Sequence, residues 1–354
     1  MTVWLVIGVA AATFFFLLKS RRNYMALPEL PVRPGPNPDG ITVIIPARNE
    51  EKNIERAVRS FPGVPVLVVD DASTDRTGEI ARAAGARVIQ APPLSKGAAG
   101  KPNACQAGAN ASESEFILFV DADTYYKPEF LPSLMSYTRS ESLDMVTAFL
   151  KQDCVTWSEK LVLPYAFALY FCGVNAENVN SRKSFDALAN GQCLLFRRNI
   201  YNFIGGHRAV SSSIIEDVML AFIAKRHRIR LRVLRAEKLG SVRMYEGMAA
   251  IFRGFEKNSF RFLLINRWCG IQVVLSSILL TSYLPVLGWL MWNHRWGLAL
   301  LFGAVPVVFL RAWYGHIGRS LFSPAAIYIF QCIAISAMFS SLLGRGVLWK
   351  GRRV

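Results

Sequence analysis

Two aspartates, Asp121 and Asp123, stand one residue apart at the end of the apolar run FILFV. Two carboxylates about 5 Å apart repel each other by roughly 3 kcal/mol at an effective dielectric constant near 20. A bound cation removes that cost, and hard carboxylate oxygens suit Mg²⁺ or Mn²⁺, which commonly bridge a protein carboxylate to substrate phosphates. The spacing therefore predicts that Asp121 and Asp123 hold Mg²⁺ or Mn²⁺ beside a phosphorylated substrate.

Polar side chains also follow two earlier apolar runs. The pair Asp70-Asp71 ends the run VPVLVV, and a five-residue segment follows ITVII: Pro46, Ala47, Arg48, Asn49 and Glu50. From Gly40 onward strand and helix patterns alternate, which is typical of an α/β fold with a mostly parallel sheet covered on both faces. Ligands bind such sheets beyond the carboxyl ends of the strands. The three polar groups are therefore expected to converge on one site.

The sequence lacks the two loops that most often cradle phosphates. It has no G-x-x-x-x-G-K-[ST] loop, and no G-x-G-x-x-G follows the first predicted strand. A diphosphate is then expected to be held by the metal. Lys101, in GKPNACQAG, is a candidate helper, and the alternative is a solvated loop lysine.

Five segments resemble a family-2 glycosyltransferase when they are taken in order: PARNE, VVDDASTD, GKPNA, FVDAD and IIEDVML. The resemblance covers about residues 40–260. It implies a Rossmann-like nucleotide-diphosphosugar transferase fold and an inverting transfer of sugar from a nucleotide-diphosphate donor. By this resemblance Asp70 or Asp71 contacts the base or ribose, and the two acids of FVDAD hold the metal and the diphosphate.

The same resemblance makes Asp217, in the pair Glu216-Asp217, the catalytic base. A single displacement needs one carboxylate to take the proton of the acceptor hydroxyl and a Lewis acid to neutralise the departing diphosphate. Glu216 is the alternative base. The pair is also suited to cap the helix beginning EDVMLAFIAK, because acidic residues are favoured at helix N-termini.

The acceptor is indicated by softer features. Processive polysaccharide synthases of this superfamily carry Q-x-x-R-W, but Leu264 stands where the glutamine should precede Arg267-Trp268. The segments SVRMYEGMAAIFRGFEKNSF and GQCLLFRRNIYNFIGGH instead resemble membrane glycosyltransferases that glucosylate the carotenoid acid diaponeurosporenoate, and their hopanoid-associated relatives. This resemblance implies that one sugar is transferred to a lipid acceptor.

Five further residues are candidates for contact with the acceptor or the diphosphate: Gly205, Gly206, His207, Arg253 and Lys257. His207 follows two glycines, which suits either an acceptor contact or an ordinary turn. Arg253 and Lys257 lie in Met244–Phe260, where basic residues alternate with apolar ones, as in a helix at a membrane interface.

Apolar segments at both ends indicate membrane attachment. Val3–Leu18 is uncharged and is followed by basic residues, whereas a cleaved signal peptide carries its basic residues first. We therefore expect an anchor with its basic end in the cytosol. Three later stretches are predicted as spans: Ile271–Trp292, Gly297–Leu310 and Ala325–Leu343. Three spans would leave the basic tail outside, so one segment is expected to be re-entrant or two to pair as a hairpin.

The net charge is +16. We expect the basic residues to bind anionic lipid headgroups rather than nucleic acid, because they cluster beside apolar segments. The predicted organisation is an anchor (1–20), a proline-rich linker (21–39), a glycosyltransferase domain (40–245), an interfacial helix region (246–270), transmembrane helices (271–345) and a basic tail (346–354). The expected location is the cell membrane, multi-pass, with the catalytic domain in the cytosol. The alternatives are a nucleotidyltransferase, a processive polysaccharide synthase or a non-catalytic membrane scaffold.

Overall fold

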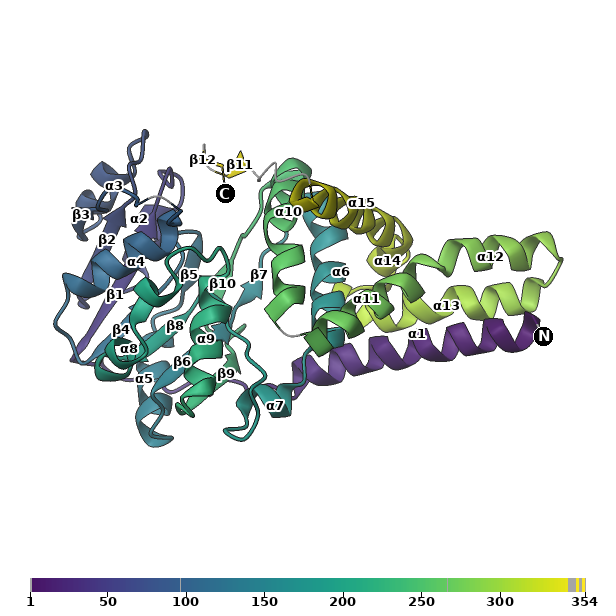
Figure 1. The fold of residues 1–354 in the computed structure, drawn as a ribbon, viewed down its shortest axis with the longest axis horizontal. Helices are drawn as coiled ribbons and strands as arrows, with labels where there is room; N and C mark the ends of the chain where they lie inside the picture. Colours follow the sequence, from purple (N-terminus) through teal and green to yellow (C-terminus); the bar gives the residue numbers. More distant parts are fainter. Residues whose placement is uncertain (1, 96, 266, 343–347, 350–351, 354) are drawn as a thin grey trace. The chain divides into compact units, whose positions relative to one another are not determined.

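The computed structural model describes residues 2–95, 97–265, 267–342, 348–349 and 352–353, and the chain forms two compact units (Figure 1). The helical unit comprises Met1–Ala26, Cys154–Ala176 and Tyr245–Val354, and the sheet unit comprises Leu27–Asp153 and Glu177–Met244. The chain therefore passes between the two units at four points. The sequence predicted one continuous domain over 40–245, but the structure assigns an internal segment of it to the helical unit.

The sheet unit is built on a seven-stranded sheet with the order β3-β2-β1-β4-β8-β6-β9. Its strands are β1 Ile41–Ala47, β2 Val66–Asp70, β3 Arg87–Gln90, β4 Phe116–Phe119, β6 Met145–Phe149, β8 Leu194–Arg197 and β9 Leu231–Arg235. All neighbouring strands are parallel except those paired with β8, which runs antiparallel to both β4 and β6. The predicted α/β fold with a mostly parallel sheet is confirmed.

Helices surround this sheet (Figure 1). They are α2 Ile54–Arg59, α3 Thr77–Ala83, α4 Gly100–Asn110, α5 Phe130–Ser140, α7 Ala176–Asn180, α8 Arg198–Phe203, the 3₁₀ helix η1 Gly206–Val210 and α9 Glu216–Arg226. Helix α4 approaches β1 so closely that a Cβ on Gly108 would lie 2.5 Å from Ile44 Cγ2. Only glycine fits at that point, and its presence lets α4 bring its first turn to the end of the sheet.

The strand register explains why the predicted polar groups converge. Ala47 at the end of β1 pairs with Asp70 at the end of β2, and Ile44 pairs with Phe119 at the end of β4. The three parallel strands are buried, apolar and in register, so the residues that follow them leave the sheet at the same edge.

A second, three-stranded sheet follows directly after the Asp121–Asp123 turn. It has the order β5-β10-β7, with β5 Thr124–Tyr126, β7 Lys151–Gln152 and β10 Gly240–Val242. Tyr126 is buried there and donates its hydroxyl to the carbonyl oxygen of Gln192, in the loop before β8. This contact connects the aspartate turn to that loop.

The proline-rich segment that was predicted as a linker packs against the sheet unit. Leu27 and Leu30 are buried, and the Leu30 N–H donates to the Arg235 carbonyl at the end of β9. The Arg235 N–H in turn donates to the Pro28 carbonyl. The first residues of the predicted linker, up to Met25, belong to the N-terminal helix. The part after them is extended, as its prolines predict, and Pro28–Leu30 extend the edge of the sheet.

The helical unit consists of helices and a short hairpin. Its elements are α1 Thr2–Met25, α6 Trp157–Gly173, α10 Gly247–Ile265, α11 Arg267–Thr281, α12 Tyr283–Trp292, α13 Trp296–Tyr314, α14 Ile317–Ser320, α15 Ser323–Leu342, β11 Leu348–Trp349 and β12 Arg352–Arg353. In Figure 1, α13 runs alongside α1, and α12 packs against α13. The predicted tail over 346–354 falls partly outside the described residues.

Helix α6 is the core helix of the helical unit. Most of its side chains are buried, and it packs against α1, α11 and α15. A capping box of Thr156 and Glu159 fixes its N-terminus. Glu159, which is fully buried, also accepts the Gly247 N–H at the start of α10.

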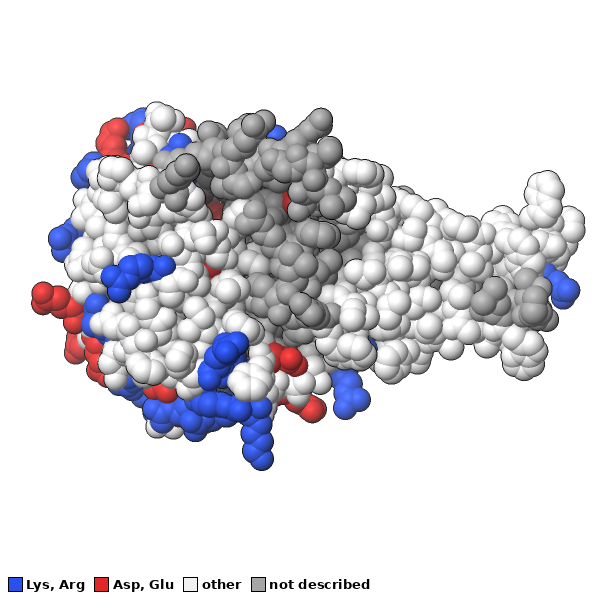
Figure 2. Space-filling view, viewed as in Figure 1, with Lys and Arg blue, Asp and Glu red and all other residues white. Residues whose placement is uncertain are grey.

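Two helical segments among the described residues are long and apolar enough to cross a membrane: Gly270–Trp292 and Trp296–Tyr314. They correspond to the first two predicted C-terminal spans. The third falls on α15, whose apolar part over Ser323–Phe339 is shorter, while Leu343 lies outside the described residues. Figure 2 shows a largely uncharged surface on these helices, whereas Lys and Arg side chains gather on the sheet unit.

Candidate active site

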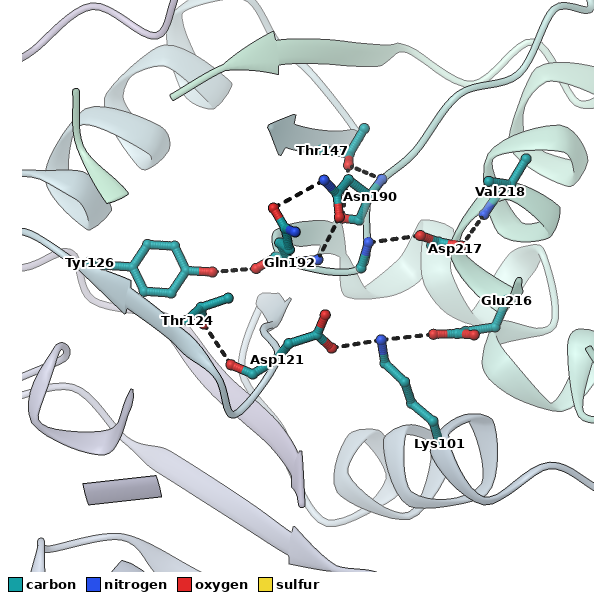
Figure 3. A network of polar contacts seen from close by, with 11 residues as sticks. Lys101, Asp121, Thr124, Tyr126, Thr147, Asn190, Gln192, Glu216, Asp217 and Val218 are labelled. Atoms are coloured by element: carbon teal, nitrogen blue, oxygen red, sulfur yellow. Dashed lines mark hydrogen bonds and ion pairs between the residues drawn. The ribbon is translucent and has the colours of Figure 1, made fainter. Parts of the chain in front are cut away.

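Lys101 joins two of the predicted site acids (Figure 3). Its Nζ lies 2.6 Å from Asp121 Oδ1, beyond β4, and 3.0 Å from Glu216 Oε1, in the first turn of α9. Burial lowers the pKa of Lys101, but the three surrounding carboxylates outweigh it, so the pKa lies well above its usual value. The lysine therefore carries a positive charge at the point where the two elements meet, and it is not a solvated loop residue.

Asp217 is oriented by two backbone amides. Its Oδ2 accepts the Gly191 N–H at 2.8 Å, and its Oδ1 accepts the Val218 N–H at 2.8 Å. Burial and the neighbouring Glu216 carboxylate raise the pKa of Asp217 to about 6, against the opposing effects of Lys101 and the two amides. A carboxylate with such a pKa is mostly ionised at neutral pH and can accept a proton.

Gly191 lies among these charged groups. A Cβ on this residue would stand 2.7 Å from Lys101 Nζ and 3.6 Å from both Asp121 Oδ2 and Asp217 Oδ2. Its φ angle is not in the left-handed region, so the glycine is required for space rather than for backbone conformation. The absent side chain leaves room for the Lys101 ammonium beside the predicted metal-binding acid and the predicted base.

The loop that carries Gly191 is fixed by its own polar contacts. The Asn190 N–H donates to Thr147 Oγ1 at 2.9 Å, and the Gln192 N–H donates to Asn190 Oδ1 at 3.1 Å. Asn190 Nδ2 donates to Gln192 Oε1 at 3.1 Å. Sequence analysis did not identify Asn190, Gly191 or Gln192 as site residues. The only available signal was a polar Asn-Gly-Gln turn directly before an apolar strand.

The loops after β1 and β2 are linked to each other. The Asn49 N–H donates to Ser73 Oγ at 3.0 Å, and Asn49 Oδ1 accepts the Thr74 N–H at 2.8 Å. The Glu50 N–H donates to Thr77 Oγ1 at 2.7 Å. Asn49 has a φ of 53°, in a left-handed conformation that asparagine tolerates better than most residues. These contacts place the PARNE and DDAST segments side by side.

The two aspartates after β2 differ in their contacts. Asp70 Oδ1 accepts the Ser73 N–H at 2.9 Å, and its Oδ2 accepts Gln90 Nε2 at 3.1 Å. The Asp71 carbonyl accepts Arg48 Nη1 at 2.6 Å. Both Asp70 carboxylate oxygens therefore help to hold the turn and a neighbouring strand in place.

The residues present fit a metal that takes part of its ligands from a substrate. No group of three or more His, Cys, Asp or Glu is arranged to hold a metal ion in the part of the chain that the structure describes. Asp121 and Asp123 share one turn, which the Thr124 hydroxyl fixes by donating to the Asp121 carbonyl at 2.5 Å. Mg²⁺ is commonly bound by one or two carboxylates together with substrate phosphates and water, and this donor set matches that pattern.

His207 is placed in the core and not at an open surface. Its side chain is buried, its Nδ1 lies 2.8 Å from the Tyr201 hydroxyl, and its ring packs edge-on against Phe119. Burial, with a smaller effect from Lys101, lowers the pKa of His207 to about 3, so the ring is neutral at pH 7. A buried, neutral His207 is not suited to contact an acceptor. Gly206, with a φ of 56°, lies against the Tyr201 ring.

The other candidate acceptor residues lie elsewhere. Gly205 has a φ of 84° and directly precedes η1 as its N-cap, so a glycine at this position serves the turn. Arg253 is an exposed residue of α10 in the helical unit. The side chain of Lys257 lies outside the described residues.

Residues 42–205 match glycosyl transferase family 2. The chain carries a family 2 glycosyltransferase domain. This confirms the resemblance drawn from the five segments. The match ends before Glu216 and Asp217, so the positions of these two acids rest on the structure of the glycosyltransferase domain itself.

The family 2 glycosyltransferase domain also has named relatives. The chain is 30% identical over 253 residues to the 4,4'-diaponeurosporenoate glycosyltransferase of Staphylococcus haemolyticus, covering 69% of this chain and 66% of that protein. For the Staphylococcus aureus (strain USA300) protein of the same name the identity is 28% over 233 residues, with 63% and 61% covered. The alignments thus leave at least a third of each relative unmatched.

A solved structure supports the fold of this chain. The mannosyltransferase of Pyrobaculum calidifontis, determined in complex with GDP-Man and Mn²⁺, aligns with a TM-score of 0.59 over 97% of this chain and 99% of that one. The sequences are 17% identical. At that identity the likeness establishes the shared fold alone.

Proposed function

We propose that this family 2 glycosyltransferase moves one sugar from a nucleotide-diphosphate donor to a lipid acceptor, with inversion at the anomeric carbon. The observation that carries the proposal is the placement of Asp217 and Asp121 around Gly191. A carboxylate oxygen of each lies 3.6 Å from the position that a Cβ on this glycine would occupy. An acid suited to take a proton thus lies near an acid suited to hold a metal and a diphosphate, with the Lys101 ammonium beside them.

The donor binds along the edge where β1, β2 and β4 end. We assign the base or ribose to Asp71 and the linked loops of Pro46, Ala47, Arg48, Asn49 and Glu50, since Asp70 uses both oxygens within the protein. Asp121, Asp123 and Lys101 lie at the diphosphate end. Bound Mg²⁺ or Mn²⁺ would supply Lewis-acid neutralisation of the departing diphosphate. The Pyrobaculum structure, solved with GDP-Man and Mn²⁺, supports this choice of ligands.

Asp217 is proposed as the base that takes the proton from the acceptor hydroxyl. Its two amide contacts fix the plane of the carboxylate, and a pKa of about 6 leaves it mostly ionised at neutral pH. Glu216 is directed to Lys101 instead, at 3.0 Å. This pairing favours Glu216 as the residue that positions the lysine and Asp217 as the base.

A lipid acceptor is supported by the relatives and by the helical unit. The relatives act on a carotenoid acid according to their names. In the helical unit Trp292 is 85% and Leu300 79% exposed, and such side chains suit a bilayer rather than water. The helix Trp296–Tyr314 has 19 residues, which is close to the length needed to cross a bilayer. We therefore propose a multi-pass membrane protein.

The direction of insertion follows from the basic residues. Lys19, Arg21 and Arg22 lie at the end of α1 that leads into the sheet unit, and Arg311 lies in the last turn of α13. The opposite end of these helices, at the α12–α13 turn, carries Arg295. The positive-inside tendency then places the first end, and the domain that follows it, in the cytosol. If α15 does not cross, the basic C-terminal tail returns to the same side.

The test is to incubate membranes containing the protein with a panel of labelled nucleotide sugars and to extract the lipids. We expect label from one donor in the lipid fraction, dependent on Mg²⁺ or Mn²⁺ and lost on chelation. Mass spectrometry of the product should show one added hexose. A nucleoside monophosphate on the lipid would indicate a nucleotidyltransferase, and a long polymer would indicate a processive synthase. No labelled product from any donor, together with no donor binding, would support a scaffold.

A further inference from the structure

Lys101 occupies the position where a cation is expected beside Asp121. Its Nζ lies at hydrogen-bonding distance from Asp121 Oδ1, 2.6 Å, and from Glu216 Oε1, 3.0 Å. The lysine is held there by the first turn of α4, next to Pro102. A Cβ on Gly191 would meet the ammonium at 2.7 Å, so the Asn190–Gln192 loop also closes around it. Lys101 thus offsets the charge of the predicted metal-binding acid.

We propose that Lys101 is an internal counter-ion that keeps Mg²⁺ or Mn²⁺ from binding Asp121 until the diphosphate of the donor arrives. This inference rests on the proposed function, because it assumes a nucleotide-diphosphate donor. A fixed ammonium and a divalent cation at the same carboxylate repel each other, since like charges a few ångström apart interact appreciably even near a protein surface. The metal alone must therefore either displace the lysine or bind weakly beside it.

The diphosphate resolves this conflict. It brings negative charge and oxygen ligands for the metal, and it also offers acceptors to the ammonium. A lysine ammonium has three N–H donors, and the ion pairs with Asp121 and Glu216 use two of them. Metal and donor are then expected to bind together, while the metal alone binds poorly. This order leaves the site without a bound metal when no donor is present.

The experiment measures Mn²⁺ binding without any turnover. The full-length protein in detergent is titrated with Mn²⁺ alone, and free Mn²⁺ is followed by its EPR signal. Lys101→Met should bind Mn²⁺ about tenfold or more tightly than the wild type, because one close positive charge is removed. Lys127→Met, which removes the same charge from an exposed position six residues beyond Asp121, should bind like the wild type. Adding Asp121→Asn to Lys101→Met should abolish the gain.

A Lys101→Met protein that binds Mn²⁺ no more tightly than the wild type would overturn the proposal. Lys101→Arg provides a second arm in case the methionine variant does not fold. It keeps the charge and should keep the weak binding of the wild type, so tight Mn²⁺ binding by this variant also contradicts the proposal. The proposed function has a separate readout. In the wild type, UDP or GDP should tighten Mn²⁺ binding, and a panel of nucleoside diphosphates without effect would refute the donor class while leaving the counter-ion result intact.

Discussion

The carboxylate of Asp217 and the backbone amide of Gly191 are joined by a 2.8 Å hydrogen bond between α9 and the loop before β8. The contact holds a carboxyl group whose pKa is raised to about 6 against a residue that has no side chain of its own. The acceptor hydroxyl, if it binds there, meets a fixed carboxylate oxygen. The position of the base therefore depends on a loop as well as on the helix that carries it.

Replacement of Asp217 by asparagine should separate chemistry from binding. Asp217→Asn keeps the size and removes the basic oxygen, and loss of a general base typically lowers the rate by about 10²- to 10⁴-fold. Donor affinity should change little, because Asp121, Asp123 and Lys101 stay in place. The measurement is transfer rate beside nucleotide-sugar affinity.

Two variants serve as controls for that experiment. Asp123→Asn should weaken metal-dependent donor binding as well as turnover. Glu216→Gln should lower the rate less than Asp217→Asn, since Glu216 contacts Lys101 rather than open space. If Glu216→Gln is inactive while Asp217→Asn transfers normally, Glu216 is the base.

The rate should depend on pH through Asp217. A base acts in its ionised form, and its pKa is raised to about 6, so kcat/KM should fall on acidification below about pH 6. The decrease should approach tenfold for each pH unit. A profile that stays flat down to pH 4.5, with the protein still folded, would be incompatible with this assignment.

Asp217→Asn should also stabilise the folded protein at neutral pH. The pKa of Asp217 rises from 3.8 in the reference state to about 6 in the folded protein, so ionisation disfavours the folded state as pH increases between these values. Ionisation of Asp217 costs the folded state at most about 3 kcal/mol, and Asp217→Asn removes this cost. The asparagine side chain also loses one of the two amide contacts, which cancels part of the gain. We expect a net gain of about 1 kcal/mol and a Tm higher by about 2 °C at pH 7. The gain should shrink on acidification and become a small loss near pH 4, where Asp217 is protonated in the folded wild type and only the lost amide contact distinguishes the variant.

Gly191→Ala tests the space between the acids. The added methyl would stand 2.7 Å from Lys101 Nζ, and the flexible lysine should yield and lose its ion pairs. We expect a Tm within about 2 °C of the wild type but a transfer rate reduced by at least about tenfold, as for a displaced catalytic group. Gly297→Ala is the matched control, because a Cβ there meets nothing within 4 Å. Equal rates for the two variants would show that the space beside Gly191 is not used.

Solubilisation of the sheet unit should require removal of α6. Deleting Met1–Ala26 and the chain after Met244 leaves Trp157–Gly173 without the helices that bury it. We expect that fragment to aggregate. A version in which Cys154–Ala176 is replaced by a Gly/Ser linker should stay soluble and monomeric in size-exclusion chromatography. If the fragment with α6 intact is equally soluble, the helical unit does not depend on α6 as its core.

The edge of the sheet where β1, β2 and β4 end was predictable because the pattern that indicates it is local in sequence. Buried parallel strands can be identified from apolar runs, and the residues after them must leave the same edge, which placed Asp121 near the PARNE and DDAST loops. The role of Gly191 depends on Thr147, Tyr126 and Asp217, which are distant in sequence, so no local pattern shows it. The assignment of α6 to the helical unit could not be predicted for a related reason: an apolar helix has the same sequence pattern in either unit.

The four passages between units determine the order in which the parts can assemble during synthesis. Helices α1 and α6 leave the ribosome before β8, α9 and β9, so the seven-stranded sheet cannot close until these two helices of the other unit have been made. The helices that follow Met244 arrive last and cover α6 only then. Neither unit can be gained, lost or exchanged as one continuous gene segment. Insertions and fusions are therefore expected to be tolerated only at the ends of the chain or in loops within one unit.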